Sequence, residues 1–355
     1  YNQAHLKVIE QTEPVGHAVR AVYMYSGMAD VAAVTGDASM RAAGRRIWDH
    51  LITSKLYLTG GIGASGSGES FGQPFELPNM TAYNETCASV GMDFWNHRLF
   101  LMEGDAKYID VMERTLYNGL VSGVSLDGKT FFYPNPLESN GQHARQEWFG
   151  VACCPGNITR FMPSVPGYLY ATRGDGVLYV NLFAQGSADI DLSGGKVKVV
   201  QTTKYPWDGA VTIAVTPERA RLAGPKLAAT PSSEGRRFAI NVRIPGWARN
   251  EAVPSDLYRF ADAAPAATIR VNGQPVPMTL DKGYVTIDRT WTAGDTIALN
   301  LPMPVRRVLS NDQVMANRNR VALQRGPIVY AAEWPDNPNG KVRNIVLPDA
   351  NALTS

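Results

Sequence analysis

The chain has 355 residues, 45% of them hydrophobic and 19% charged, which is ordinary for a globular protein with room for roughly two or three domains. A formal net charge of +2 without a long basic run argues against nucleic acid or an anionic membrane surface as the partner, and no window approaches about eighteen consecutive apolar residues. Because residue 1 is Tyr and a helix-like pattern begins at once, we expect a segment of a longer protein.

Two similar segments in the first half predict helical hairpins in series. Residues 36–56 and 104–124 each begin with Gly-Asp-Ala, and they follow apolar-rich segments at 18–35 and 89–103. In both, the Gly can end one helix and the Asp can cap the next, after which apolar residues recur at spacings of three and four. We expect about five or six helices up to Tyr170, which is part of an (α/α)6 toroid of six such hairpins.

The segment between these hairpins, "TGGIGASGSGES" at 59–70, has the Gly-x-Gly-x-x-Gly spacing of a dinucleotide-binding turn. Such a turn needs a buried strand before the glycines and a helix that starts on the last of them. Here a helix tail precedes the segment, and Pro74 and Pro78 follow it where a helix would have to run, so we reject nucleotide binding. Glu69 is then either a solvated loop acid or a catalytic group on a loop whose glycines let the backbone approach a ligand.

The three cysteines stand in two short motifs. Glu85 and Cys87 lie two residues apart just before a predicted helix, so their side chains can act together only if the backbone there is extended or turned. Cys153 and Cys154 are adjacent, and Pro155 is expected at the first position of the next helix, whose dipole favours a thiolate.

These three sulfurs and one carboxylate make a complete tetrahedral set for zinc, although the spacing is not that of a zinc finger. From the residues alone, buried thiols without a metal, a vicinal disulfide and a purely structural zinc remain alternatives.

From Gly176 onward the hydrophobic period changes to two, which indicates strands. Short β-branched and aromatic runs are separated by Gly, Pro and Asn turns, a rhythm that predicts one or two antiparallel β-sandwiches. The whole is an α+β multidomain fold, with helical residues 1–171 followed by a β-sandwich region at 172–355. The segment 217–235 lacks strand alternation and is expected to be a long surface loop.

Four stretches, at 60–72, 83–120, 131–138 and 148–170, together resemble glycoside hydrolase family 127, the β-L-arabinofuranosidases. The resemblance runs along essentially the whole chain, and its "ETC" and "CCPGN" motifs are highly specific, whereas the strand-rich part is not. It implies the second half of that family's (α/α)6 barrel followed by β-sandwiches. It also implies a retaining, zinc-dependent glycosidase that releases L-arabinose from plant or glycoprotein β-L-arabinofuranosides.

The resemblance further implies roles for individual residues. That family holds zinc with one Glu and three Cys, uses one of these cysteines as the nucleophile and a separate Glu as the acid/base, and lines the sugar pocket with other side chains. The positions that match are Glu85, Cys87, Cys153 and Cys154 for zinc, Cys153 for the nucleophile, Glu69 for the acid/base, and His17 and Tyr133 for the sugar pocket. Zinc would keep the Cys153 sulfur a thiolate.

Two other functions fit the same residues. The same machinery could act on another sugar, because fold and nucleophile do not fix the substrate, or the chain could be a carbohydrate-binding protein in which zinc only joins the two cysteine motifs. The partner is an arabinofuranoside or related oligosaccharide, and a homodimer is an open alternative to a monomer. Reduced thiols favour the bacterial cytoplasm, while a periplasmic or secreted location stays open. Tripeptides of the glycosylation pattern begin at Asn79, Asn84 and Asn157, and we interpret them as coincidence.

Overall fold

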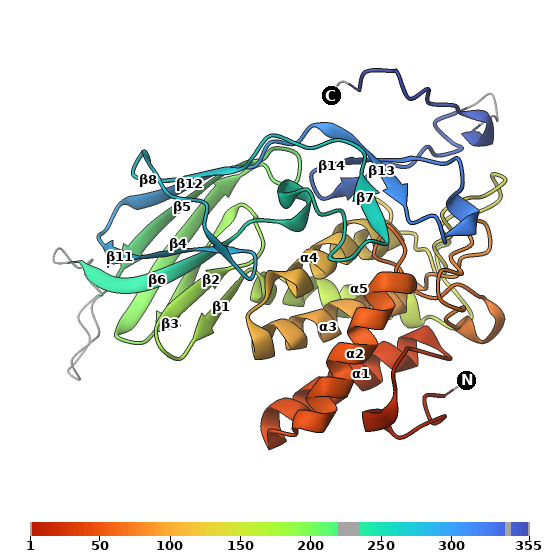
Figure 1. The fold of residues 1–355 in the computed structure, drawn as a ribbon, viewed down its shortest axis with the longest axis horizontal. Coiled ribbons are helices and arrows are strands. Elements are labelled where there is room, and N and C mark those ends of the chain that lie inside the picture. Colours follow the sequence, from red (N-terminus) through yellow and green to blue (C-terminus); the bar gives the residue numbers. More distant parts are fainter. Residues whose placement is uncertain (1, 219–234, 338–341, 354–355) are drawn as a thin grey trace.

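The first half of the chain forms helices and the second half forms strands (Figure 1). The computed structural model describes residues 2–218, 235–337 and 342–353. The α-helices are α1 (Ala18–Thr35), α2 (Ala38–Ser54), α3 (Thr86–Glu103), α4 (Ala106–Thr115) and α5 (Cys153–Phe161). Short helical segments are η1 (Val8–Glu10), η2 (Ser67–Glu69), the π-helical η3 (Leu116–Leu120), η4 (Val121–Gly123), η5 (Met162–Tyr168), η6 (Gly246–Arg249), η7 (Met315–Asn317) and η8 (Val342–Asn344).

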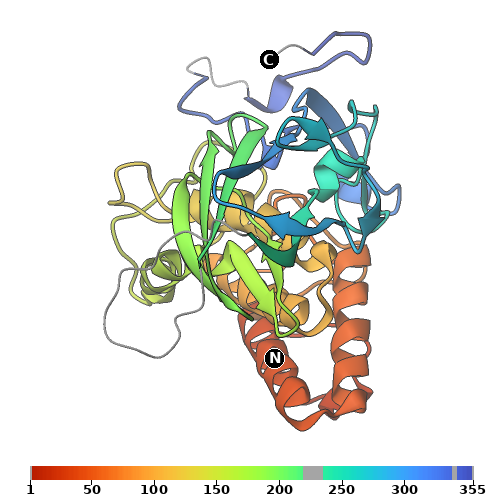
Figure 2. The same ribbon diagram turned by 90° about the vertical axis from the view of Figure 1, so that its left-hand side faces the viewer.

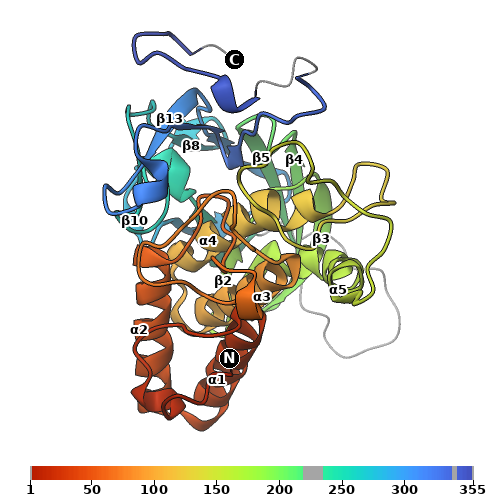
Figure 3. The same ribbon diagram turned by 90° about the vertical axis from the view of Figure 1, so that its right-hand side faces the viewer.

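Both predicted helical hairpins are confirmed. Helix α1 ends at Gly36 in the left-handed conformation, and the Asp37 carboxylate accepts hydrogen bonds from the first turn of α2. Helix α3 ends in the same way at Gly104, and Asp105 caps α4. Figures 2 and 3 show α1 and α2 side by side as a hairpin that extends away from the sheets. The complete toroid stays a prediction, because the five α-helices of the described residues are fewer than the twelve of six hairpins.

Helices α1 and α3 pack closely because α3 carries a glycine at their crossing. A Cβ atom at Gly91 would lie 2.4 Å from the Val22 side chain and 3.0 Å from the Tyr23 ring, so only glycine allows this approach. The helical core around this contact contains large buried side chains that include Tyr25, Trp48 and Trp95. None of the helices in the described residues combines the length and apolar character needed to cross a membrane.

The strands of the described residues form three sheets. The first has the order β1-β2-β6-β11-β10, with β1 (Tyr170–Arg173), β2 (Val177–Val180), β6 (Arg236–Arg243), β10 (Leu280–Asp281) and β11 (Tyr284–Trp291). The second has the order β3-β4-β5-β12-β8-β9, with β3 (Gly186–Leu192), β4 (Gly195–Thr203), β5 (Ala210–Pro217), β8 (Thr268–Val271), β9 (Gln274–Pro275) and β12 (Asp295–Asn300). The third has the order β15-β14-β13-β7, with β7 (Tyr258–Phe260), β13 (Val305–Ser310), β14 (Ala322–Arg325) and β15 (Ile328–Val329).

The predicted antiparallel sheets are confirmed, with one exception. Within the described residues all strand pairings are antiparallel except that of β2 with β6. This pairing is parallel, and the long excursion through β3, β4 and β5 supplies the connection that two parallel strands need. The first two sheets share one hydrophobic core, to which β4, β5, β6 and β11 contribute alternate residues, so they form a sandwich. The loop expected at 217–235 lies almost entirely outside the described residues.

The third sheet packs against the helices instead of forming a second sandwich. Its residues Tyr258 and Val308 belong to the helical core, and the Tyr258 hydroxyl donates to the Leu56 carbonyl oxygen that follows α2. In Figure 1 this sheet (β7, β13 and β14) lies above the helices, to the right of the sandwich. The third sheet and the helices therefore share one hydrophobic core.

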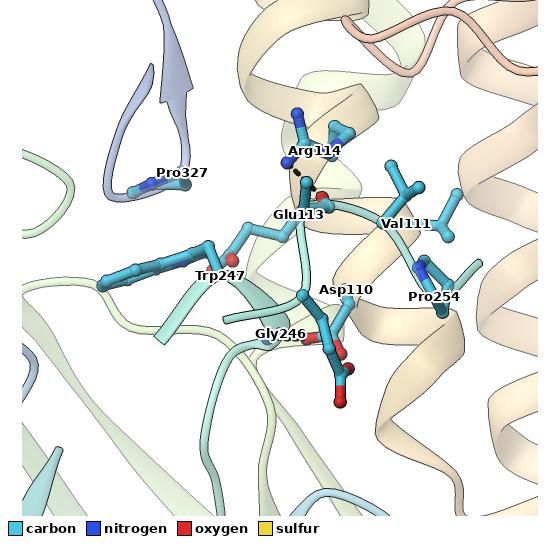
Figure 4. A pocket seen from close by; sticks show the side chains of 11 residues that line it. Asp110, Val111, Glu113, Arg114, Gly246, Trp247, Pro254 and Pro327 are labelled. Carbon is cyan, nitrogen blue, oxygen red and sulfur yellow. Dashed lines mark hydrogen bonds between the residues drawn. The ribbon is translucent and has the colours of Figure 1, made fainter. Parts of the chain in front are cut away.

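A group of buried charges, here called the junction cluster, joins α4 to the sandwich. It consists of Asp110 and Glu113 of α4, Arg243 of β6, and Arg249 of η6. Arg243 is fully buried and donates to both acids, and Arg249 donates to Asp110 at 2.7 Å. Figure 4 shows the side chains of α4 beside the segment that carries Gly246, Trp247 and Pro254. Each buried charge here has a partner of opposite sign.

Arg114, next to Glu113 on α4, joins the helices to the third sheet. Its guanidinium donates to the Leu58 carbonyl oxygen at 2.8 Å, to the Ala252 carbonyl oxygen, and to the Gln324 side chain of β14 at 3.0 Å. Burial lowers the pKa of Arg114 to about 10, so the side chain is still charged at neutral pH. The orientation of α4 is thus fixed from both sides, by the junction cluster and by Arg114.

Candidate active site

An open cavity of about 850 Å³ brings the sequence-predicted residues together, although they span residues 17 to 154. It lies where α1, α3 and α5 begin. The predicted residues that line it are His17, Glu69, Glu85, Cys87, Tyr133 and Cys153. Cys154 is fully buried directly beneath Cys153. All seven candidate residues therefore meet in one place.

Two helix N-termini hold the predicted metal ligands. Glu85 precedes α3 with extended backbone angles, and Cys87 is the second residue of α3. The non-helical backbone at Glu85 is what the sequence analysis required for the two side chains to act together. Cys153 and Cys154 are the first two residues of α5. Pro155 is thus the third helical residue, and its predicted place at the first was wrong. The first-turn N–H groups of a helix have no intrahelical acceptor, so a proline fits at any of these positions.

The four ligand atoms form a tight group, here called the donor cluster: Glu85, Cys87, Cys153 and Cys154. The Cys154 sulfur lies 3.4 Å from that of Cys87 and 3.8 Å from that of Cys153. The Glu85 Oε1 atom lies 3.4 Å from the Cys153 sulfur and 3.6 Å from that of Cys154. All three cysteines are free thiols, so the vicinal disulfide is absent.

The donor cluster fits a zinc ion in size. With Zn–S and Zn–O bonds of about 2.3 and 2.0 Å, a regular tetrahedron has S–S edges of about 3.8 Å and S–O edges of about 3.5 Å. The four separations given above lie within a few tenths of an ångström of these edges, and all four atoms lie within 4.8 Å of one another. The Glu85 Oε2 atom is buried and has no hydrogen-bond partner among the described residues.

The donor cluster also fits a cation in charge. Burial raises the pKa of Glu85 to about 8 and that of Cys153 to about 12, and the hydrogen bond to Cys87 raises the pKa of Cys154. The hydrogen bond between the two sulfurs also lowers the pKa of Cys87 to about 6. Of the four donors, Cys87 has a lowered pKa, while the pKa values of the other three are raised. A divalent cation would offset the repulsion among four anionic ligands.

Glu69 lies beside His17 because the loop that carries it folds back on the start of α1. Ser65 and Ser70 exchange backbone hydrogen bonds, and Phe71 N donates to the Gly16 carbonyl oxygen at 3.0 Å. The His17 Nε2 atom is 2.6 Å from the Glu69 Oε2 atom. Glu69 has a φ of 51°, a left-handed conformation that disfavours a non-glycine residue by about 1 kcal/mol. Such local strain is concentrated at functional sites.

Tyr83 is a site residue that sequence reasoning missed. Its hydroxyl donates to the Glu69 Oε1 atom at 2.9 Å, so protein groups contact both oxygens of this carboxylate. Glu69 is therefore not a freely solvated loop acid, although its side chain remains 31% exposed to the cavity side. Its position in the sequence could have indicated this role, because Tyr83 stands two residues before the predicted metal ligand Glu85.

The glycines before Glu69 have a packing role. Residues 60–63 are buried. A Cβ atom at Gly60 would lie 2.6 Å from the Thr115 Cα atom, and one at Gly61 would lie 2.9 Å from the Asn84 side chain. These glycines allow the loop to pass between the end of α4 and the segment before α3, so their close approach is to the protein itself.

Tyr133, expected in the sugar pocket, contacts the predicted nucleophile. The Cys153 thiol donates to the Tyr133 hydroxyl oxygen at 3.1 Å, and the Tyr133 carbonyl oxygen accepts from the Thr86 N–H group at the start of α3. Asn157 of α5 also lines the cavity, and sequence reasoning had treated it only as part of a glycosylation pattern. The geometry thus places a cysteine sulfur beside a tyrosine hydroxyl, and a carboxyl group between His17 and Tyr83.

Sequence profiles of one glycosidase family match three consecutive parts of the chain. Residues 1–167 match the beta-L-arabinofuranosidase, GH127 catalytic domain. Residues 177–303 match the GH127 middle domain, and residues 305–354 match the glycoside hydrolase family 127 C-terminal domain. These matches cover nearly all of the chain.

Individual proteins agree with these profiles. A non-reducing end beta-L-arabinofuranosidase from Bifidobacterium longum subsp. longum is 37% identical over 363 aligned residues, which cover 98% of this chain and 50% of that relative. A solved GH127 beta-arabinofuranosidase has a TM-score of 0.88 and 52% identity, covering 95% of this chain and 50% of the other. A solved GH127 beta-L-arabinofuranosidase from Geobacillus stearothermophilus T6 has a TM-score of 0.81 and 42% identity, covering 93% and 49%. The chain spans about half the length of these proteins.

Proposed function

The chain belongs to glycoside hydrolase family 127, and we propose that it provides the catalytic centre of a retaining β-L-arabinofuranosidase that uses zinc. The observation that carries this proposal is the position of the Cys153 sulfur. Cys153 is exposed to the cavity, yet its sulfur belongs to a donor cluster whose other three members are buried. A group that is both a metal ligand and accessible from the cavity can react with a substrate.

In this proposal the four members of the donor cluster would hold zinc. When bound, zinc keeps a coordinated thiol deprotonated at neutral pH, which supplies the thiolate that burial alone disfavours at Cys153. The Tyr133 hydroxyl lies 3.1 Å from the same sulfur, and it can donate a hydrogen bond to this sulfur once the thiol has lost its proton. Of the three sulfur-bearing residues, Cys87 and Cys154 are buried and Cys153 is exposed.

The first chemical step would transfer the sugar to Cys153. The sulfur attacks the anomeric carbon and forms a C–S bond, while the C–O bond to the leaving group breaks. Glu69 gives its proton to the departing oxygen, so that the aglycone leaves as an alcohol. His17 and Tyr83 position the two oxygens of this carboxyl group for the transfer.

The second step would release the sugar. The Glu69 carboxylate takes a proton from water, whose oxygen attacks the anomeric carbon. The C–S bond breaks and its electron pair returns to Cys153, which restores the thiolate and the protonated Glu69. Two displacements at the same carbon retain its configuration. The rule that relates the separation of two carboxylates to stereochemistry does not apply, because the nucleophile is sulfur.

The sugar that we propose is β-L-arabinofuranose, because the proteins of this family that match the chain are named for that activity. A cavity of about 850 Å³ has room for this sugar and part of its aglycone. We also propose that α1 to α5 are part of an (α/α)6 barrel, supported by the two hairpins and the catalytic-domain match.

The test is chemical trapping of the nucleophile. The zinc-loaded chain is treated with a mechanism-based β-L-arabinofuranoside inactivator, and the peptide that contains residues 151–157 is examined by mass spectrometry. A sugar on Cys153, lost in Cys153→Ala, is the expected result. Glu69→Gln should keep its zinc while losing hydrolysis. Full hydrolysis by Cys153→Ala would overturn the mechanism, and a panel of aryl furanosides and pyranosides would identify a different sugar.

A further inference from the structure

One amide, that of Asn135, is bonded to the residues on both sides of Glu85. Its Nδ2 atom donates to the Asn84 carbonyl oxygen at 2.8 Å and to the Thr86 Oγ1 atom at 3.0 Å. Asn84 directly precedes Glu85 in the chain, and Thr86 directly follows it. A residue 51 positions after Asn84 therefore holds the segment that carries the predicted metal ligand.

The direction of this amide follows from its two acceptors. A carbonyl oxygen only accepts, and the Thr86 hydroxyl already donates its hydrogen to the Phe132 carbonyl oxygen at 3.0 Å. Both neighbours must therefore receive a hydrogen from Asn135, so its NH₂ group faces them. The backbone adds a third bond, because the Asn135 N–H group donates to the Tyr83 carbonyl oxygen at 2.8 Å.

The segment that Asn135 holds has a strained backbone. Asn84 has a φ of 41°, in the left-handed region that residues with a side chain rarely adopt. Glu85 then returns to a φ of −58° and a ψ of 136° before α3 begins. After this reversal the Glu85 carboxylate lies 3.4 Å from the Cys153 sulfur. Strained conformations persist only where surrounding contacts hold them, and the bonds from Asn135 are such contacts.

The same segment also reaches the proposed acid/base. The Tyr83 hydroxyl donates to the Glu69 Oε1 atom at 2.9 Å, while the Tyr83 carbonyl oxygen accepts from Asn135. On its other side, the N–H groups of Tyr83 and Asn84 donate to the Gly63 carbonyl oxygen at 3.1 and 2.9 Å. The segment thus lies between the loop that contains Gly63 and the loop that contains Asn135.

We infer that Asn135 is a positioning residue for the metal centre, whose amide NH₂ group holds the backbone on both sides of Glu85 so that the carboxylate completes the donor cluster. The inference rests on the proposed function, because that function assigns Glu85 as a zinc ligand. Loss of an outer group that orients a metal ligand typically weakens metal binding 10- to 100-fold. Because Asn135 acts through the neighbours of the ligand, we expect the lower end of this range.

The main test variant is Asn135→Ala, which removes both side-chain donors and keeps the backbone bond to Tyr83. Zinc affinity is measured by competition with a chromophoric chelator, and the visible absorption is recorded after Co²⁺ substitution, because it reports the arrangement of the ligands. We expect zinc binding to weaken about tenfold and the cobalt bands to shift. Thr86→Val keeps the shape of the side chain but removes one acceptor of the amide, so it should have a smaller effect of the same sign.

The matched control is Asn118→Ala. Asn118 is also half-buried, and its Nδ2 atom likewise donates to two oxygens, the carbonyl groups of Arg114 at 2.8 Å and Pro327 at 2.9 Å. These bonds join the helices to the segment between β14 and β15, so this variant should lose thermal stability while its zinc affinity and cobalt spectrum match those of the parent.

Thermal unfolding of the metal-free variants shows which of them are folded, and Thr86→Val decides if Asn135→Ala does not fold. Parent-like zinc affinity and cobalt spectrum in the folded variants of Asn135 and Thr86 would overturn this inference alone. An equal loss of zinc affinity in Asn118→Ala would overturn it as well, because the effect would then come from general destabilisation. A parent chain that binds neither metal would instead overturn the proposed function together with it.

Discussion

The two buried polar clusters of this molecule differ in how their charges are compensated. In the junction cluster, two arginines face two acids, and every buried charge has a side chain of opposite sign within hydrogen-bond distance. In the donor cluster, all four groups become anions when they lose their protons, and their ligand atoms contact one another and the Tyr133 hydroxyl.

This difference in charge compensation indicates a structural role for the junction cluster and a metal-binding role for the donor cluster. A buried network that is complete in itself holds layers together, whereas a buried group of like-charged donors needs a component from outside the chain. The junction cluster should therefore respond to substitution mainly through stability. The donor cluster should respond mainly through metal binding and turnover. Each of the following measurements tests this division.

The largest expected effect is on turnover. Cys153→Ala removes the proposed nucleophile and should lower kcat/KM for an aryl β-L-arabinofuranoside by about 10⁴-fold or more, as for other enzymes that lose a covalent nucleophile. The Cys153 side chain is exposed, so the free energy of unfolding of the metal-free chain should change little. Steady-state kinetics and urea unfolding check the two halves of this prediction. A large loss of metal-free stability would place Cys153 with the structural residues instead.

The second prediction concerns the junction cluster, where we expect a substitution to lower stability. Arg243→Met leaves Asp110 and Glu113 buried without their shared cation, and should reduce the free energy of unfolding by about 3–5 kcal/mol. Arg237→Met is the matched control, because Arg237 lies on the same strand and also pairs with an acid, Asp288, but at the exposed surface. Urea unfolding should show little change for the control. Equal effects of the two substitutions would remove the distinction between buried and exposed pairs.

The third prediction concerns the donor cluster without metal. Its Glu85 carboxyl keeps a proton up to about pH 8 in the folded chain, because burial raises its pKa from the ordinary value of 4.5. Stability linked to this group is complete below pH 4.5 and is lost as the pH rises through 8. Glu85→Gln stays neutral, so at pH 8 the metal-free variant should be more stable than the metal-free parent by on the order of 2 kcal/mol.

With zinc bound, the parent should be more stable than Glu85→Gln. The parent gains binding energy through its carboxylate ligand, whereas Glu85→Gln offers a poorer ligand and gains less. Urea unfolding at pH 5 and pH 8, each with a chelator and with zinc, gives the four values required. If the metal-free variant is no more stable than the parent at pH 8, the uncompensated anions do not oppose folding.

Much of the fold could be predicted from the sequence because its signals are local. The Gly-Asp pairs at 36–37 and 104–105 mark helix ends through caps that involve only neighbouring residues, and the alternation after Gly176 marks strands. The packing of the third sheet on the helices and the parallel pairing of β2 with β6 were not predictable in this way. They depend on contacts between residues far apart in the chain, which a local pattern does not encode.

In the candidate site too, the residues with a local sequence signal could be predicted, and those that depend on distant contacts could not. Two compact motifs contain residue types that bind zinc, and they hold Glu85 with Cys87 and Cys153 with Cys154. The structure brings the two motifs together. Asn135 was missed because an asparagine carries no such signal by itself. Its place becomes informative only when the carbonyl oxygen of Asn84, from a distant part of the chain, is found on its amide.

The smallest effect that we predict concerns the hydrogen bond to Glu69. Tyr83→Phe removes the donor to the Oε1 atom and leaves His17 on the other oxygen, so kcat should fall by about tenfold, or about 1.4 kcal/mol, while zinc affinity is unchanged. Tyr25→Phe is the matched control, because the buried Tyr25 hydroxyl has no hydrogen-bond partner among the described residues. Both variants lose one hydroxyl from the helical half of the chain, and only the first should slow turnover. If both slow it equally, the effect comes from the packing of the helices, and the carboxyl group does not depend on Tyr83.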